Sequence, residues 1–190
     1  MGKVLWHTPM SLDGFIAGPD DDMGWVFDID GGSGETAHEV VRSTGALLVG
    51  RRTQDVEDRL QPGFYGGAFR GPFFVLRHDP PAQPPVVKGV TGQFLDVGIQ
   101  EAVTRAKEAA NGANVVVLGA NVARQCLEAG LVDEIIVHIA PVLVGAGVRF
   151  YESAGRAPVR LAAISSHMEG ETTVLRYAVP NTTNVARRRH

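Results

Sequence analysis

VVVLGANVARQCLEAGLVDEIIVHIAPVLVG, residues 115–145, contains a complete strand–helix–strand unit. Residues 115–118 form a short apolar run of the kind found in strands that are covered on both faces. Residues 121–130 have helical spacing and end at Gly130, and residues 133–145 begin the next apolar run. Parallel strands need a crossover connection, usually a helix, so this stretch predicts an α/β fold.

The same alternation extends through the rest of the chain. Apolar runs predict further strands, and amphipathic runs predict further helices. The expected strands are residues 3–9, 46–50 and 72–77, and the expected helices are residues 34–45, 52–60 and 99–111. Residues 159–179 alternate between apolar and polar around a Glu-Gly-Glu turn, which predicts a C-terminal antiparallel hairpin. We therefore expect a mixed, mostly parallel sheet flanked by helices.

Composition and charge limit the function classes. The 190 residues are 44% hydrophobic, which suits one domain over residues 1–180, followed by a flexible basic tail over residues 181–190. The net charge of −3 gives no electrostatic footprint for nucleic acid. No apolar run approaches the roughly 20 residues that cross a bilayer, and the N-terminus does not resemble a secretory signal. We expect a cytoplasmic protein that binds neither membrane nor nucleic acid.

Cysteine and histidine usage gives no sign of a disulfide or a metal site. Cys126 is the single cysteine, and the six histidines are scattered without metal-ligand spacing. His7 and His138 fall within expected strands, and we interpret them as core or wall residues. The sequence therefore predicts no bound metal.

A glycine leads from one expected strand into the next helix. The backbone N–H groups around Gly119, Ala120 and Asn121 and the helix dipole would favour an anion at this point. The alternative is an ordinary turn in which Asn121 caps the helix. One glycine is a weaker signal than a full Gly-x-Gly-x-x-Gly motif.

Arginines follow two other expected strands. Gly50 precedes Arg51 and Arg52, and Thr53 could cap the helix after them. Arg77 ends the expected strand at 72–77 and is followed by a histidine. Solvated surface charge is the alternative interpretation of each group.

Together, the three strand ends indicate a phosphorylated dinucleotide. A helix start suits a pyrophosphate, and guanidinium groups suit a phosphate monoester, which arginine binds through paired hydrogen bonds. No acidic residue follows a Gly-rich turn at the distance of about 20 residues that would hold an unphosphorylated ribose. The sequence therefore predicts NADPH as the cofactor.

Four motifs in this order resemble the dihydrofolate reductase superfamily. They are SLDGFIA at 11–17, GRRT at 50–53, LRHDPP at 76–81 and the stretch from 115 to 147. The resemblance is closest to the branch shared with the reductase domain of bacterial riboflavin biosynthesis. It implies an NADPH-dependent reductase that transfers hydride to a C=N or C=O bond of a small substrate, pterin-like or a riboflavin-precursor pyrimidine. The alternative is a non-catalytic NADP-binding protein on the same fold.

The resemblance also implies roles for individual residues. Arg51 and Thr53 would bind the adenosine phosphate and the pyrophosphate of NADPH. Arg77 would bind the region of the 2′-phosphate. Ile16 and Ala17 would flank the nicotinamide in a mobile loop. The full set of implied cofactor-binding residues is Ile16, Ala17, Gly50, Arg51, Arg52, Thr53, Leu76, Arg77, Gly119, Ala120, Asn121 and Val122.

A lid over the site is the expected role of the segment that ends at Trp25. Met23-Gly24-Trp25 resembles the Met-Pro-Trp that closes the corresponding loop in dihydrofolate reductases, and Asp13 begins the same loop. Closure of such a loop would exclude water from hydride transfer. A tryptophan that plugs one end of the core is the alternative.

The substrate-facing carboxylate is predicted at Asp30. It lies five residues after Trp25, which is the spacing expected from the resemblance to dihydrofolate reductases. A carboxylic acid there could supply the proton that reduction requires. Asp28 is an alternative, and Glu35 is a second if the glycines between them are an insertion. These acids could equally be solvated residues beside a helix start, where Thr36 could act as a cap.

A homodimer is the expected assembly. Residues 140–155 are apolar and Gly-rich, which is unusual for a surface loop. The riboflavin-type relatives pair through the sheet edge that follows such a segment, and pairing would remove an edge strand from solvent.

Overall fold

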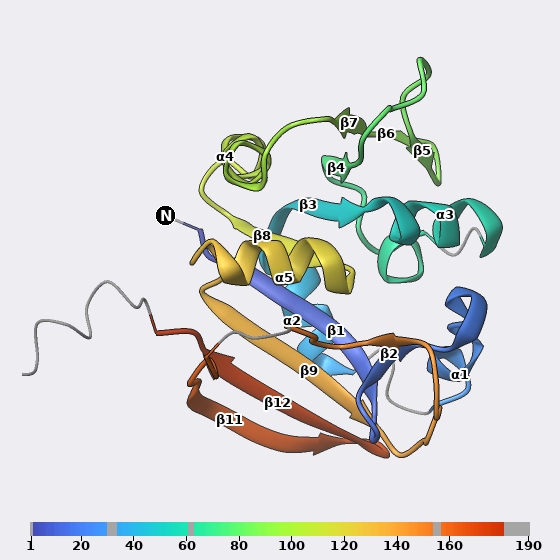
Figure 1. Cartoon of the computed structure of the whole chain (residues 1–190), viewed down its shortest axis with the longest axis vertical. Helices are drawn as coiled ribbons and strands as arrows, with labels where there is room; N and C mark the ends of the chain where they lie inside the picture. The colour runs from blue at the N-terminus through green and yellow to red at the C-terminus, as the bar shows by residue number, and fades with distance from the viewer. Residues whose placement is uncertain (1, 30–33, 61–62, 154–156, 181–190) are drawn as a thin grey trace, which may run out of the picture.

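The computed structural model describes residues 2–29, 34–60, 63–153 and 157–180. Within them, the strands form one eight-stranded sheet with the order β11-β12-β9-β1-β8-β3-β4-β7 (Figure 1). Its strands are β1 (Val4–Ser11), β3 (Thr44–Gly50), β4 (Phe73–Leu76), β7 (Gln93–Leu95), β8 (Asn114–Leu118), β9 (Glu134–Ala140), β11 (Ala162–Glu169) and β12 (Thr172–Ala178). The six strands from β9 to β7 run parallel, and β12 pairs antiparallel with both β9 and β11. The predicted mostly parallel sheet and its C-terminal hairpin are confirmed.

Helices cover both faces of the sheet. α4 (Ile99–Ala109) and α5 (Ala120–Glu128) lie on one face, and α2 (Glu35–Ser43) lies on the other (Figure 1). The alternation of β1 divides its side chains between two cores, since Val4 and Trp6 pack with α4 and α5 while Leu5 packs with α2. The period of two in a strand thus assigns each residue of β1 to one face.

The remaining elements are short. α3 (Arg51–Leu60) follows β3 directly, and the 3-10 segments are η1 (Pro19–Asp21) and η2 (Phe64–Gly67). α1 (Gly24–Phe27) lies in the loop that ends near Trp25. β2 (Phe15–Ala17) pairs with β10 (Val148–Arg149), and β5 (Val86–Val87) pairs with β6 (Val90–Thr91). α3 was expected at residues 52–60 and is confirmed, whereas the other elements were not predicted because each spans too few residues to repeat a pattern.

Three predicted helix caps are wrong. α2 begins after Gly34, so Thr36 lies inside its first turn. α3 begins at Arg51, which places Thr53 in the helix as well. Gly119 occupies the cap position of α5, and the Asn121 side chain accepts a hydrogen bond from Gln125 at 2.7 Å. Gly119 has φ 92°, a conformation that glycine adopts without strain, so the backbone turns into α5 before Asn121 is reached.

Three helices end earlier than expected, and one of them is α4, which stops at Ala109 instead of residue 111. α2 stops at Ser43 because Thr44 and Gly45 already belong to β3. α5 stops at Glu128, and Gly130 follows with φ 68°. The predicted tail at 181–190 lies outside the described residues.

Candidate functional site

The carboxyl ends of three parallel strands meet at one edge of the sheet. Val49 pairs with Leu118, and Gly50 pairs with Leu76, so β8, β3 and β4 end side by side. α3 and α5 begin immediately after β3 and β8. The structure therefore brings residues 50–53, 76–77 and 119–122 to a common edge, the place where ligands bind in open α/β sheets. Their contact with a cofactor stays a prediction.

The two helix starts approach each other closely. A Cβ atom built at Gly119 would lie 2.7 Å from Thr53 Oγ1, and one built at Gly50 would lie 3.1 Å from Val122 Cγ2. Gly119 also has a positive φ, so any other residue there would strain the backbone. Glycine at positions 50 and 119 thus lets the first turns of α3 and α5 pack closely against the strand ends.

The arginines of this edge have different surroundings. The Arg51 side chain is exposed and pairs with Asp55 at 3.4 Å, and that of Arg52 is exposed and pairs with Asp21 at 3.8 Å. Arg77 is partly buried, with its guanidinium 5.3 Å from the centre of the Phe94 ring. Among the described residues, no group accepts a hydrogen bond from its buried Nε. Arg77 therefore has an unused donor at the end of β4.

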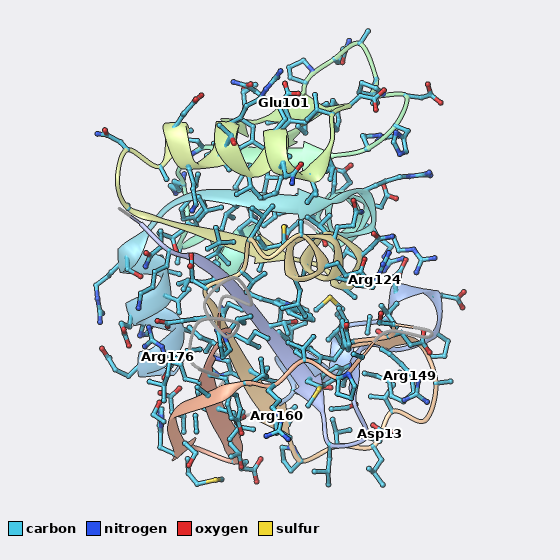
Figure 2. All side chains as sticks on the ribbon, turned by 60° about the vertical axis from the view of Figure 1, so that its left-hand side comes forward. Asp13, Glu101, Arg124, Arg149, Arg160 and Arg176 are labelled. Carbon is cyan, nitrogen blue, oxygen red and sulfur yellow. The ribbon has the colours of Figure 1, made fainter. Side chains whose placement is uncertain are left out.

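Asp13, which was assigned to the lid, braces a second loop. Its carboxylate accepts hydrogen bonds from Ser11 Oγ at 2.6 Å, Val144 N at 3.0 Å and Gly145 N at 2.7 Å. The hydrogen bond from Ser11, followed by that from Val144, lowers the pKa of Asp13 to about 2. Figure 2 shows Asp13 and Arg149 at the same end of the molecule, where Arg149 lies 4.7 Å from the Phe15 ring. The carboxylate thus joins the start of the lid to the loop after β9.

The segment that the sequence predicts to be a lid contacts α3. Asp20 and Asp21 have φ values of 55° and 57°, and their carbonyl oxygens accept hydrogen bonds from the Arg59 guanidinium at 3.3 and 3.1 Å. Met23 and Trp25 are half-buried, and Trp25 Nε1 is shielded with no acceptor among the described residues. Ile16 and Ala17 are buried in β2. The loop is therefore folded against the helix that starts at Arg51.

Two histidines and a tyrosine form a buried polar chain on the α2 face. His7 Nδ1 lies 2.7 Å from Tyr65 Oη, and His7 Nε2 lies 2.8 Å from His138 Nε2. Burial, followed by the neighbouring His138, lowers the pKa of His7 to about 3, and burial also lowers the pKa of His138. Both imidazoles are therefore neutral at pH 7. They were predicted to be core or wall residues, but nothing in the sequence indicated their contact with each other or with Tyr65.

The structure describes two of the three acids proposed from the sequence. Asp30 lies outside the described residues. Asp28 is exposed after α1, and Glu35 is exposed and pairs with Arg42 at 2.7 Å. The role of Asp28 or Glu35 as the substrate-facing carboxylate stays a prediction.

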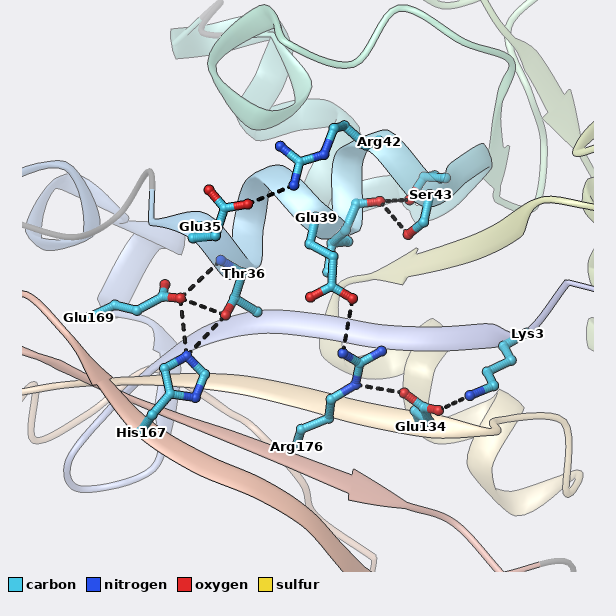
Figure 3. Close-up of polar contacts among 12 residues, drawn as sticks. Lys3, Glu35, Thr36, Glu39, Arg42, Ser43, Glu134, His167, Glu169 and Arg176 are labelled. Carbon is cyan, nitrogen blue, oxygen red and sulfur yellow. Dashed lines mark hydrogen bonds and ion pairs between the residues drawn. The ribbon is translucent and has the colours of Figure 1, made fainter.

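A different carboxylate lies at the start of α2 (Figure 3). Glu169 Oε1 accepts hydrogen bonds from Thr36 N at 2.9 Å and Thr36 Oγ1 at 2.6 Å, and it lies 3.1 Å from His167 Nε2. Burial raises the pKa of Glu169, but the hydrogen bonds from Thr36 and His167 outweigh it and hold the pKa below its usual value. Sequence reasoning placed Glu169 only in a hairpin turn, and no local signal relates it to Thr36.

Farther along α2, an ion-pair network joins the helix to the sheet. Arg176 on β12 donates to Glu134 at 2.8 Å and to Glu39 at 3.2 Å, and Lys3 also pairs with Glu134 (Figure 3). The network fixes α2 over β9 and β12, and so fixes the position of Thr36 near Glu169.

Within the described residues, no helix is long and apolar enough to cross a bilayer. In the same part of the chain, no three His, Cys, Asp or Glu side chains are grouped as metal ligands.

Three known proteins are similar to this chain. The uncharacterised protein YwjB of Bacillus subtilis strain 168 is 24% identical over 166 residues, covering 84% of this chain and 88% of its own. A protein of Shewanella sp. PV-4 provisionally assigned to riboflavin biosynthesis is 18% identical, with a TM-score of 0.78 over 94% of this chain and 99% of its own. A diaminohydroxyphosphoribosylaminopyrimidine deaminase/5-amino-6-(5-phosphoribosylamino)uracil reductase of Thermotoga maritima is 17% identical, with a TM-score of 0.73 over 94% of this chain and 57% of its own.

The structural neighbours share the fold at low sequence identity, which confirms the dihydrofolate reductase-like architecture expected from the four motifs. The family assignment comes from the sequence itself. Since the family model of the RibD C-terminal domain matches residues 2–175, the chain belongs to the RibD C-terminal domain family.

Proposed function

We propose that the protein is an NADPH-dependent reductase of a small heterocyclic substrate of the pyrimidine type. The observation that carries the proposal is the meeting of two helix starts and Arg77 at one edge of the sheet. Family membership supports a reductase, and the neighbour from Thermotoga maritima is a deaminase/5-amino-6-(5-phosphoribosylamino)uracil reductase.

The charges at this edge suit an anionic cofactor. Arg51 and Arg52 occupy the first turn of α3, and neither α3 nor α5 has an acid in its first turn. Cations at a helix start oppose the helix dipole, so these arginines gain stability when phosphate binds between them and the N–H groups. The unused donor of Arg77 would bind a further phosphate oxygen. The residues present therefore fit NADPH.

The chain would bind and orient the two reactants while its lid excludes water. NADPH supplies a hydride when bound. The backbone N–H groups at 119–122 would hold the pyrophosphate, and Arg77 would favour the 2′-phosphate. The lid between Asp13 and Trp25 would close over the nicotinamide end.

The reduction also needs a proton. Hydride adds to the carbon of a C=N or C=O bond, and a proton must then reach the nitrogen or oxygen. Tyr65, His7 and His138 form a hydrogen-bonded chain that could pass such a proton.

Cofactor titration tests the proposal. We expect NADPH to quench protein fluorescence with a lower Kd than NADH, and single-turnover oxidation of NADPH to follow the addition of 5-amino-6-(5-phosphoribosylamino)uracil or 7,8-dihydrofolate. Equal affinity for the two cofactors would contradict the cofactor assignment. Tight NADPH binding without oxidation across a panel of pyrimidines and pterins would favour the non-catalytic alternative.

A further inference from the structure

Glu169 carries a polar atom that the fold leaves without a partner. Its side chain is 12% exposed, and its Oε2 atom is shielded from solvent. Among the described residues, no group donates a hydrogen bond to this oxygen. All the hydrogen bonds of Glu169 in the described structure go to the other oxygen, Oε1.

Strand pairing places Glu169 at the same edge of the sheet as the proposed cofactor site. Ser11 at the end of β1 pairs with Ala140 at the end of β9. β12 starts beside this end, since Thr173 pairs with Ile139, and Thr172 pairs with Glu169. Glu169 therefore lies beyond the carboxyl ends of β1 and β9, on the side of the edge away from β3 and β4.

The groups around Glu169 keep its carboxylate ionised. Thr36 donates from its backbone N–H and its hydroxyl, at the positive end of the α2 dipole. His167 contacts the same oxygen, and the neighbouring His138 interacts with the carboxylate electrostatically. A shielded, ionised oxygen without a donor costs free energy, so the unpaired Oε2 of Glu169 needs an explanation.

We propose that Glu169 is the substrate-anchoring carboxylate of the reductase site, with Oε2 accepting a hydrogen bond from a ring N–H of a planar heterocycle. This inference rests on the proposed function for the reaction, but it assigns the anchoring role to the hairpin turn instead of the segment after Trp25. It also explains why Asp28 and Glu35 can be exposed.

The geometry limits the class of substrate. Oε1 is saturated by Thr36 and His167, so the carboxylate has one oxygen to offer and cannot form a two-point pair with an amidine. A lactam or imide N–H, as found in uracil-type rings, matches a single acceptor. A ring whose nitrogens are all methylated offers no donor and would leave Oε2 unpaired.

The variant Glu169→Gln separates this role from a structural one. A glutamine keeps an Oε1 acceptor for Thr36 but places an NH2 group at the position of Oε2, which turns an acceptor into a donor. Glu171→Gln is the matched control, since Glu171 is exposed two residues farther along the same turn. Thermal unfolding of both variants would establish that the fold is retained.

The probes are two pairs of rings, each an N–H-bearing ring and its methylated form. One pair is uracil and 1,3-dimethyluracil, and the other is xanthine and 1,3,7-trimethylxanthine. Each probe is titrated against the whole chain by ligand-observed NMR, with and without NADP⁺. We expect the unmodified protein and Glu171→Gln to bind at least one N–H-bearing ring, and to bind its methylated partner about 10- to 100-fold more weakly. Glu169→Gln should lose that preference while still unfolding in one cooperative transition and keeping its affinity for NADPH.

Two results would overturn the inference. One is a preference for N–H-bearing rings that survives in Glu169→Gln, and the other is the absence of any such preference in the unmodified protein. Failure of the proposed function would give a different result. The protein would then bind no NADPH, but the heterocycle titrations without cofactor would still show whether Glu169 determines the preference for N–H-bearing rings.

Discussion

His7 and His138, on neighbouring parallel strands, share a contact of 2.8 Å between their Nε2 atoms. One ring must donate and the other accept, so the pair is stable only while at least one of them is neutral. The same ring of His7 also contacts Tyr65. The buried face of β1 therefore contains a polar chain that depends on pH.

Acid should destabilise the fold through this pair. The pKa of His7 is about 3 in the folded state and about 6.5 in the unfolded chain, so the unfolded chain binds more protons between these values. The free energy of unfolding should fall by up to about 1.4 kcal/mol per pH unit for one such histidine as the pH drops from 6.5 toward 3. Urea denaturation at a series of pH values measures this slope. His7→Gln should make this slope shallower, with the lowered pKa of His138 accounting for part of what remains, and His38→Gln on the exposed side of α2 is the matched control.

Cofactor selectivity should depend on Arg77. Arg77→Ala removes a buried donor at the end of β4, and we expect the preference for NADPH over NADH to fall about tenfold or more. Arg51→Ala should have a smaller effect because that side chain is exposed. Fluorescence titration with both cofactors gives the ratio, with Arg105→Ala on α4 as the control. An unchanged ratio in Arg77→Ala would refute this role.

Gly119 should tolerate no side chain. Gly119→Ala combines a positive φ with a Cβ atom 2.7 Å from Thr53 Oγ1, and we expect a loss of about 1 to 3 kcal/mol in the free energy of unfolding. Thr53→Ala in the same chain removes the contact but not the backbone strain, so stability should return only in part. Gly98→Ala is the matched control because its Cβ would meet no atom within 4 Å. If Gly119→Ala combined with Thr53→Ala recovered the full free energy of unfolding, the positive φ of Gly119 would contribute nothing to the loss of stability.

Asp13→Asn should loosen the loop after β9. The neutral side chain is a weaker acceptor for the Val144 and Gly145 amides, so their hydrogen exchange should accelerate. Exchange monitored by mass spectrometry would detect this in peptides that cover residues 141–147. Asp28→Asn serves as the comparison. Equal amide hydrogen exchange in the two variants would argue against a stabilising role of Asp13 in the loop after β9.

The structure suggests which surface would form the interface of the predicted homodimer. β11 is the outer strand of the sheet, and its Ile164 and Met168 are exposed together with Leu161 just before it. We expect a homodimer that covers this edge, since an exposed apolar edge strand favours pairing. Light scattering at micromolar concentration should give twice the chain mass, and Ile164→Asp should shift it toward the monomer. A monomeric mass for the unmodified protein would reject the dimer.

Local pattern predicted the regular elements and the common edge, because strand alternation and helical spacing are properties of a few neighbouring residues. The stretch 115–145 was sufficient to predict β8, α5 and β9. Contacts between distant residues were not predictable in this way. His7 meets Tyr65 and His138 only after the sheet and η2 are assembled, and Glu169 reaches Thr36 across 133 residues of chain. The helix starts failed for a related reason, since a glycine with positive φ began α5 where a side-chain cap was expected.

The central position of β1 also governs the order in which the protein can fold. Val4 pairs with Val115 on one side, and Leu5 pairs with Glu134 on the other, so both partners of this strand come more than 100 residues later in synthesis. Contacts of such long range require costly loop closure and fold slowly. While the ribosome makes the first two thirds of the chain, the apolar residues of β1 have no strand to join. The nascent chain therefore needs protection from aggregation until β8 and β9 have emerged.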